Sequence, residues 1–326
     1  MSNLDTYTST GAKYRHHPRM IESLRNGIGK PQSLQVALTN RCNLKCVFCS
    51  VAERELKQEW NYTELRKAID SFMSVGIKTI EFSGGGEPTL YPQFNELVKE
   101  CHERKLKLGL ITNGLKLEDL PIATLTRFDW IRISMVALDY QEKIDLPDNF
   151  PDNVTIGMSY VVGQKEYQGK RTHWESDYLQ LMKIAEYAGR YNAEFVRIVP
   201  ECFSDEHEMT LLHEYYQNVC NAAGTPFMFQ PKRLSQAKCC YMDSVKPWAD
   251  VDGYIYPCNS ISLLSDAHRY FHPKYRLCHW TEIEDYYKNR GNKSLNITTC
   301  DRCAFTKNNE IVEQLLQLLE HGDFIK

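Results

Sequence analysis

The segment RCNLKCVFCS, residues 41–50, places Cys42, Cys46 and Cys49 within eight residues. Thiolates are soft ligands that suit iron–sulfur clusters and zinc, and this spacing lets one short loop surround a single metal centre. A four-iron cluster held by three cysteines keeps one iron without a protein ligand, and an open metal position is typical of a catalytic site. The three cysteines therefore predict a reactive metal centre.

The sequence around this segment alternates between two periods. Short apolar or β-branched runs predict strands over residues 33–39, 78–84, 106–112, 130–136, 154–162 and 194–200. Helix-period segments lie between most of them, over residues 62–76, 93–105 and 176–190; in the last of these, Leu179, Met182, Ile184 and Ala185 are expected to share a face. This alternation predicts an α/β protein built from parallel βα units, either a barrel or an open doubly wound sheet.

Distinctive residues follow the predicted strands where those strands end. The cysteine segment follows the first strand, SGGGEPTLYP (83–92) the second, TNG (112–114) the third, and PECFS (200–204) the sixth, while Ser134 closes the fourth. In both architectures chemistry collects in the loops at the carboxyl ends of the strands. These loops are therefore expected to form one site.

Composition excludes several classes of protein. The chain has 326 residues, 42% hydrophobic and 25% charged, which suits a globular protein with one large domain and a smaller appendage. A net charge of -3 argues against a nucleic-acid partner. No segment approaches the roughly 18 apolar residues of a membrane span, and the polar first residues carry no signal peptide, so a cytoplasmic location is expected. Twelve cysteines in a reducing compartment indicate metal ligation rather than disulfides.

The character of the sequence changes after about residue 232. Cysteines stand at positions 239, 240, 258, 278, 300 and 303, among glycines, prolines and aromatic residues with little periodicity. We therefore divide the chain into an N-terminal extension (1–32), an α/β barrel or sheet (33–232), a small metal-stapled domain (233–305) and a C-terminal helix (306–326). In the last segment Ile311, Leu315, Leu316 and Leu319 recur at helical spacing.

The pattern Cys42-x3-Cys46-x2-Cys49, with Phe48 directly before the third cysteine, resembles the signature of the radical S-adenosylmethionine (SAM) superfamily. The resemblance implies a partial (β/α)6 TIM-like barrel and a [4Fe-4S] cluster whose open iron binds SAM. It also implies a low-potential electron donor such as flavodoxin or ferredoxin, and a 5'-deoxyadenosyl radical that abstracts a hydrogen atom from the substrate. The alternative is a structural zinc site with a distant fourth cysteine.

Three further positions match the same superfamily. Gly85-Gly86-Glu87 is similar to its glycine-rich motif, which binds the amino group of SAM, and glycines allow a backbone to approach a ligand closely. Asn113 and Ser134 match in kind the polar residues that contact the ribose or carboxylate of SAM. Either residue could instead cap the segment that follows it.

The C-terminal cysteines resemble a twitch domain, the shortened relative of the SPASM domain. The matching pattern is Cys240-x12-Gly253-x4-Cys258, followed after a gap by Cys300-x2-Cys303, and it implies one auxiliary [4Fe-4S] cluster. Residues 304–326 contain no cysteine, so a second auxiliary cluster is not expected. Cys239 or Cys278 could replace one ligand, and a four-thiolate zinc site is the alternative.

Enzymes of this kind include oxidoreductases, which pass a second electron to the auxiliary cluster, and epimerases, in which a cysteine returns a hydrogen atom. Cys202 and Cys278 are the candidate hydrogen donors, whereas Cys101 and Cys220 fall on helical segments and are expected in the core. Arg197 lies in a strand and could face either the cavity or a salt bridge outside. We expect a small polar substrate of the sugar, aminocyclitol or nucleoside type, because only about 32 residues precede the first strand, too few for a peptide-recognition domain. The alternatives are modification of a ribosomally made peptide and a zinc-stapled binding protein without turnover.

Overall fold

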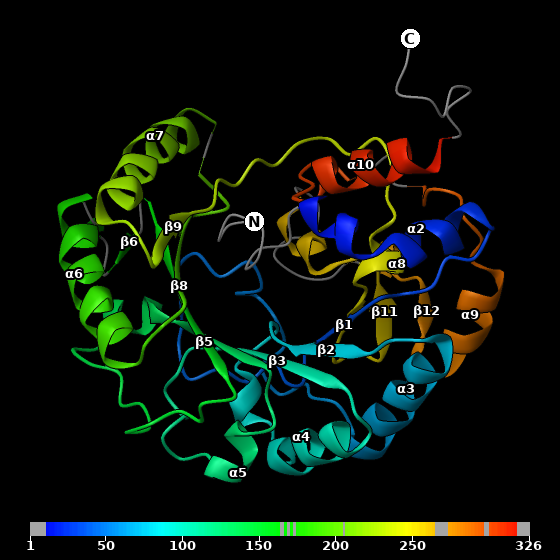
Figure 1. The fold of residues 1–326 in the computed structure, drawn as a ribbon, viewed down its shortest axis with the longest axis horizontal. Coiled ribbons are helices and arrows are strands. Elements are labelled where there is room, and N and C mark those ends of the chain that lie inside the picture. Colours follow the sequence, from blue (N-terminus) through cyan, green and yellow to red (C-terminus); the bar gives the residue numbers. More distant parts are fainter. Residues whose placement is uncertain are drawn as a thin grey trace.

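The six predicted strands form one parallel sheet in chain order. The computed structural model describes residues 11–163, 166–167, 170–171, 174–204, 206–264, 273–296 and 300–317. The strands are β1 (Leu34–Val36), β2 (Thr79–Phe82), β3 (Lys107–Thr112), β4 (Trp130–Ser134), β5 (Thr155–Val162) and β8 (Phe195–Pro200), and each pairs in parallel with the next. A doubly wound sheet reverses its strand order at a switch point. This order does not reverse and the sheet curves, as in a partial barrel (Figure 1).

Helices cover the outer side of the curved sheet (Figure 1). They are α3 (Tyr62–Val75), α4 (Phe94–Glu103), α5 (Ile122–Leu125), α6 (Trp174–Arg190) and α7 (Glu206–Ala223). Helix α3 begins where the Asn61 side chain accepts hydrogen bonds from the amides of Thr63 and Glu64, and it ends at Gly76, whose φ of 113° is left-handed. The 3-10 turns are η1 (Gly11–His16), η2 (Pro88–Leu90), η3 (Met135–Asp139), η4 (Asn259–Leu263), η5 (Pro273–Tyr275) and η6 (Trp280–Glu282).

The buried face of α6 differs from the predicted one. Leu181, Ile184 and Ala188 are buried, whereas Leu179 and Met182 are 66% and 51% exposed, so the prediction for these two residues was wrong. The cause is Asp177, which lies on the buried face and whose carboxylate accepts a hydrogen bond from the Tyr216 hydroxyl at 2.6 Å. A polar residue on the core side shifts the apolar pattern away from the true core face.

The sheet continues beyond the six predicted strands at both edges. β9 (Phe227–Phe229) pairs in parallel with β8, and β10 (Trp248–Ala249) pairs in parallel with β1. β11 (Tyr254–Tyr256) and β12 (Cys278–His279) then add antiparallel strands, so the segment after residue 232 extends the barrel sheet. A separate hairpin consists of β6 (Glu166–Tyr167) and β7 (Lys170–Arg171).

Three helices follow residue 240, and the last of them packs against the first helix of the described chain. They are α8 (Met242–Val245), α9 (Ile283–Asn289) and α10 (Thr306–Leu316), and α10 packs against α2 (Pro18–Arg25) beside η1 (Figure 1). Met20 and Val312 are buried in this contact, and the Arg25 guanidinium donates to the Leu315 carbonyl. The predicted C-terminal helix thus begins at residue 306, while residues 318–326, including Leu319, lie outside the described residues.

Two glycines make room for the floor of the barrel. A Cβ atom on Gly109 would lie 2.2 Å from the Trp130 ring, and one on Gly157 would lie 2.0 Å from the Phe195 ring. Trp130 and Phe195 are the first residues of their strands, so their rings fill the amino-terminal end of the barrel. Chemistry is therefore confined to the opposite end. None of the described helices combines the length and apolar character that a membrane crossing needs.

Candidate active site

A cavity of about 1160 Å³ runs from the carboxyl ends of the strands into the barrel. The cysteine loop, the glycine-rich loop and Asn113 line it near the strand ends, and Trp130 and Phe195 line it near the opposite end. The loops that the sequence placed at one face therefore surround one space.

The thiols of Cys42, Cys46 and Cys49 are close neighbours at this cavity. Burial, together with the charges of Cys49 and Cys42, raises the pKa of Cys46 to about 12. Burial also raises the pKa of Cys42. The Arg54 guanidinium lies 3.5 Å from the Cys49 sulfur and is held by the Asn40 and Val51 carbonyls. Cysteines bind an iron–sulfur cluster as thiolates, and a fixed cation beside three clustered cysteines favours that anionic form.

The type and number of these donors suit an iron–sulfur cluster. Among the described residues, no three His, Cys, Asp or Glu side chains converge closely enough to bind one metal ion. Each thiolate of a [4Fe-4S] cluster binds a different iron, so cluster ligands are spread farther apart than the ligands of a zinc ion. Three thiols on one loop beside one cavity are a donor set that fits such a cluster.

The glycine-rich loop packs directly against the cysteine loop. The Gly86 amide donates to the Thr39 carbonyl at 2.7 Å, and the Glu87 amide donates to the Arg41 carbonyl at 2.7 Å. A Cβ atom on Gly86 would lie 1.9 Å from the Arg41 oxygen, and Gly85 has a left-handed φ of 72°. Only glycine permits this approach, which leaves Gly85 and Gly86 lining the cavity.

Glu87 connects the glycine-rich loop to the end of β3. Its buried carboxylate accepts hydrogen bonds from the Thr112 hydroxyl and the Asn113 amide, both at 2.7 Å. Burial raises the pKa of Glu87, and these hydrogen bonds oppose the shift. The Asn113 side chain in turn donates to the Asn43 side chain at 2.7 Å and lies 3.9 Å from the Cys42 sulfur. Glu87 thus positions Asn113 against the cysteine loop.

The structure brings most of the other candidates to the same cavity. Phe48, Ser134 and Cys202 line it, and the Cys202 carbonyl accepts a hydrogen bond from Arg302 at 3.0 Å. Cys278 is not among the lining residues; it is buried on β12, where burial and the charge of Glu282 together raise its pKa to about 12. The candidate hydrogen donors therefore reduce to Cys202. Cys101 and Cys220 are buried in α4 and α7, as expected.

Sequence reasoning missed two residues beside the cysteine loop. One is Arg54, whose only signal is its position five residues after Cys49. The other is Tyr140, whose hydroxyl accepts a hydrogen bond from the Val47 amide at 3.2 Å and interacts with the Cys46 thiol. Tyr140 carries no sequence signal, because only the fold brings it to the loop.

Four C-terminal thiols form a second group. Charge on Cys258 and Cys303 raises the pKa of Cys240 beyond the effect of burial, and Cys303 acts in the same way on Cys258. A hydrogen bond between the Cys300 and Cys303 thiols raises the pKa of Cys300. Cys239 is less deeply placed and interacts mainly with Glu313 and Glu310. The grouped residues are Cys240, Cys258, Cys300 and Cys303.

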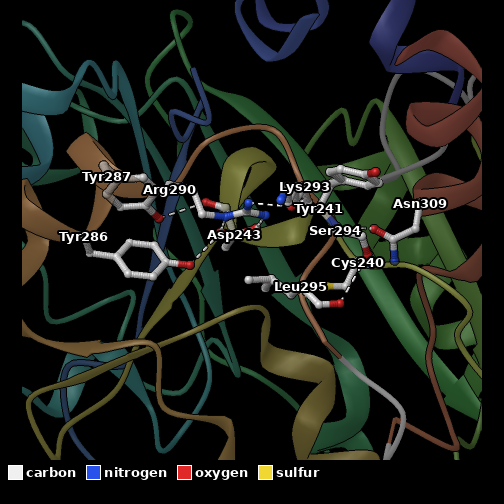
Figure 2. Close-up of polar contacts among 10 residues, drawn as sticks. All are labelled: Cys240, Tyr241, Asp243, Tyr286, Tyr287, Arg290, Lys293, Ser294, Leu295 and Asn309. Carbon is white, nitrogen blue, oxygen red and sulfur yellow. Dashed lines mark hydrogen bonds and ion pairs between the residues drawn. The ribbon is translucent and has the colours of Figure 1, made fainter. Parts of the chain in front are cut away.

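Buried polar contacts hold the segment around Cys240 (Figure 2). The Cys240 amide donates to the Ser294 hydroxyl at 2.9 Å, and the Cys240 carbonyl accepts from the Leu295 amide at 3.0 Å. The loop that carries Ser294 is tied to α8 by an ion pair between Arg290 and Asp243, whose side chains are 4% and 0% exposed.

Comparison with known proteins agrees with the family resemblance that the cysteine loop carries. Residues 36–150 match the family model of the radical SAM superfamily. Over these residues the chain is similar to the radical SAM superfamily. It is 32% identical over 121 residues to the tungsten-containing aldehyde ferredoxin oxidoreductase cofactor-modifying protein of Pyrococcus furiosus, covering 34% of this chain and 32% of that protein. It is 31% identical over 123 residues to the mycofactocin maturase MftC of Mycobacterium ulcerans, covering 37% and 33%. The S-adenosylmethionine-dependent nucleotide dehydratase of Lacinutrix mariniflava is 28% identical over 128 residues, covering 37% and 27%.

In these alignments the chain spans about a third of the length of each relative. Solved structures extend the likeness in fold. Streptococcus suis SuiB bound to precursor peptide SuiA has a TM-score of 0.55 at 16% identity, covering 77% of this chain and 65% of SuiB. The structure of anSMEcpe with bound AdoMet has a TM-score of 0.52 at 15% identity, covering 88% and 84%. At these identities the likeness concerns the fold alone.

The contact between Gly86 and the cysteine loop gives a testable expectation. Gly86→Ala should destabilise the protein by about 1–3 kcal/mol, because the added methyl group overlaps the Arg41 carbonyl and pushes the loop away. The denaturant midpoint and the iron retained after anaerobic reconstitution both measure the effect, and both should fall.

The matched control is Gly189→Ala in α6, where an added Cβ atom meets nothing within 4 Å. That variant should retain its iron and gain up to about 1 kcal/mol from helix propensity. Equal behaviour of the two variants would show that the close approach of Gly86 is unimportant.

Proposed function

We propose that this radical SAM protein is an enzyme that cleaves SAM reductively and abstracts a hydrogen atom from a small polar metabolite of the sugar, aminocyclitol or nucleoside type. The observation that carries the proposal is the grouping of three thiols, the glycine-rich loop and Asn113 around one cavity. When bound by Cys42, Cys46 and Cys49, a [4Fe-4S] cluster supplies the electron that splits SAM into methionine and the 5'-deoxyadenosyl radical.

The residues of the chain bind and orient SAM in this proposal. The backbone of Gly85 and Gly86 faces the amino group, and the side chains of Asn113 and Ser134 hold the carboxylate or ribose. Phe48 supplies an apolar contact, and all five residues line the cavity. Glu87 fixes Asn113 rather than contacting the ligand through its carboxylate, because that carboxylate is occupied by protein donors.

The size of the cavity supports a small substrate. Ligand sites commonly measure roughly 300–1,000 Å³, and this cavity of about 1160 Å³ has to hold both SAM and the substrate. A second candidate is modification of a peptide, favoured by the similarity to the mycofactocin maturase and to SuiB, which binds a precursor peptide. A peptide substrate would insert one side chain and leave its backbone outside.

Two outcomes are compatible with the second group of thiols. In an oxidation, Cys240, Cys258, Cys300 and Cys303 would hold an auxiliary [4Fe-4S] cluster, a twitch-type site, which would supply an acceptor for the second electron of the substrate. In an epimerisation, the Cys202 thiol at the cavity returns a hydrogen atom. A low-potential donor such as flavodoxin or ferredoxin supplies the first electron in both cases.

Iron and acid-labile sulfide per chain, measured after anaerobic reconstitution, test the proposal together with the formation of 5'-deoxyadenosine from SAM and dithionite. We expect about eight irons and eight sulfides, which equals two cubanes, and we expect 5'-deoxyadenosine. About four irons with SAM cleavage would remove the auxiliary cluster and its electron path. Bound zinc without SAM cleavage would replace the enzyme by a zinc-stapled binding protein.

A further inference from the structure

The interior of the barrel carries an excess of positive charge. Arg132 on β4, Arg197 on β8, Lys232 and Lys246 all line the cavity. Glu81 on β2 also lines it, and it is engaged by Lys246 at 3.3 Å and by the Gln35 amide. The side chains of Glu81 and Lys246 are only 13% and 18% exposed. Two other carboxylates line the cavity, but Glu87 accepts hydrogen bonds from Thr112 and Asn113, and Asp129 accepts one from the Leu108 amide. Glu81 is therefore the carboxylate beside these four cations, and it is already paired with Lys246.

The remaining three cations form no close ion pair among the described residues, although the charge of Glu81 acts on both Arg132 and Arg197. No ion pair joins Arg132, Arg197 or Lys232 to any residue that the structure describes. The Nε atoms of Arg132 and Arg197 are buried without a hydrogen-bond partner among the same residues. Buried donors without partners are costly, so such a group in a cavity indicates a ligand that satisfies it.

The two arginines also lie close to each other. In the sheet, Arg132 is level with Gly157 of β5 and Arg197 is level with Ser159, so only one strand with small residues separates them. Burial and the charge of Arg132 together lower the pKa of Arg197 well below its usual range, and the charge of Glu81 opposes this shift only in part. Burial likewise lowers the pKa of Lys232, and the charges of Arg197 and Arg132 add to this effect. These cations repel one another unless an anion lies between them.

We propose that Arg132, Arg197 and Lys232 bind a phosphate or diphosphate group of the substrate, which makes the substrate of the proposed function a phosphorylated metabolite. A single carboxylate would balance only one of three unpaired cations, whereas a phosphoryl or diphosphoryl group carries two or more negative charges. The arginine fork also matches two oxygens of such a group at once. The position is deeper in the barrel than the cysteine loop, so the anion anchors one end of the substrate while its other end faces SAM.

The test is calorimetric titration of the anaerobically reconstituted protein with pyrophosphate at fixed ionic strength. We expect wild type to bind pyrophosphate and Arg132→Gln and Arg197→Gln each to bind it at least about tenfold more weakly, because each removes charge-assisted hydrogen bonds. Arg197→Lys should fall between wild type and Arg197→Gln, since lysine keeps the charge but loses the fork. Lys116→Gln, which changes a cation outside the cavity, should leave the affinity unchanged.

Malonate separates phosphate from carboxylate chemistry, since we expect it to bind at least about tenfold more weakly than pyrophosphate. Equal affinity for malonate, absent pyrophosphate binding, or unchanged affinity in both arginine variants would overturn the proposal. Misfolding is checked by thermal unfolding of each variant, which should be no less stable than wild type because a repelling cation is gone.

The inference rests on the proposed function for its substrate, but this titration needs no SAM cleavage. A protein that binds pyrophosphate without forming 5'-deoxyadenosine would refute the proposed function alone.

Discussion

Replacing Cys42, Cys46 and Cys49 together by alanine should abolish 5'-deoxyadenosine formation and remove about four of about eight irons per chain. The three thiols line the cavity, whereas Cys240, Cys258, Cys300 and Cys303 form a separate group. Loss of the first group should therefore leave the second group able to hold its iron. Anaerobic reconstitution, iron analysis and chromatographic detection of 5'-deoxyadenosine measure both effects.

The converse variant and a matched control complete this test. Cys258→Ala with Cys303→Ala should lose the other half of the iron and keep SAM cleavage without substrate. Cys220→Ala removes a thiol that is buried in α7 and whose raised pKa has burial as its one cause, so its iron content should equal that of wild type. Continued SAM cleavage in the triple variant would refute the assignment of the first cluster. Full iron in the Cys258 and Cys303 variant would refute that of the second.

The sequence predicted the six parallel strands because their apolar, β-branched runs record burial on both faces, as for β5, where most residues are buried. It missed β9 to β12, because strands of two or three residues are too short to show a period. The loops at the carboxyl ends were predictable as a group, since parallel strands bring those ends to one face. The exclusion of Cys278 from the cavity was not, because it depends on β12 joining the sheet beside β11.

The charged residues inside the barrel show what sequence reasoning could have found. Arg197 was singled out as a charge in a strand with its direction left open, and it lines the cavity. Arg132 and Glu81 carry the same signal, since each is the charged residue of a short apolar strand. On β4 the alternation is visible, with Ile131 and Ile133 fully buried while Arg132 and Ser134 line the cavity. The excess of positive charge inside the barrel could not be predicted, because it depends on how the fold brings these strands together.

Asp243→Asn should cause the largest loss of stability among single substitutions in the C-terminal segment, about 3–5 kcal/mol in the free energy of unfolding. The carboxylate of Asp243 is fully buried and pairs with the Nε and Nη2 atoms of Arg290, and it also accepts a hydrogen bond from the Tyr286 hydroxyl at 2.7 Å (Figure 2). Asparagine keeps the size of the side chain but removes its charge. The Arg290 guanidinium, 4% exposed, would then be a buried cation without a counter-ion.

The control for Asp243→Asn is Asp119→Asn. This substitution breaks the ion pair between Asp119 and Lys116, whose side chains are 64% and 47% exposed. It should lower the free energy of unfolding by at most about 1 kcal/mol. The double variant Asp243→Asn with Arg290→Gln should recover part of the loss, because the uncompensated cation is gone. Denaturant unfolding followed by circular dichroism measures all three variants under anaerobic conditions.

Since Arg290 also donates to the Lys293 carbonyl, next to the Ser294 that binds the Cys240 amide, Asp243→Asn should lower the iron held by the second group of thiols as well. Equal stability losses in Asp243→Asn and Asp119→Asn would show that the buried ion pair does not hold this segment. Normal iron retention despite a large stability loss would separate the ion pair from the cluster site.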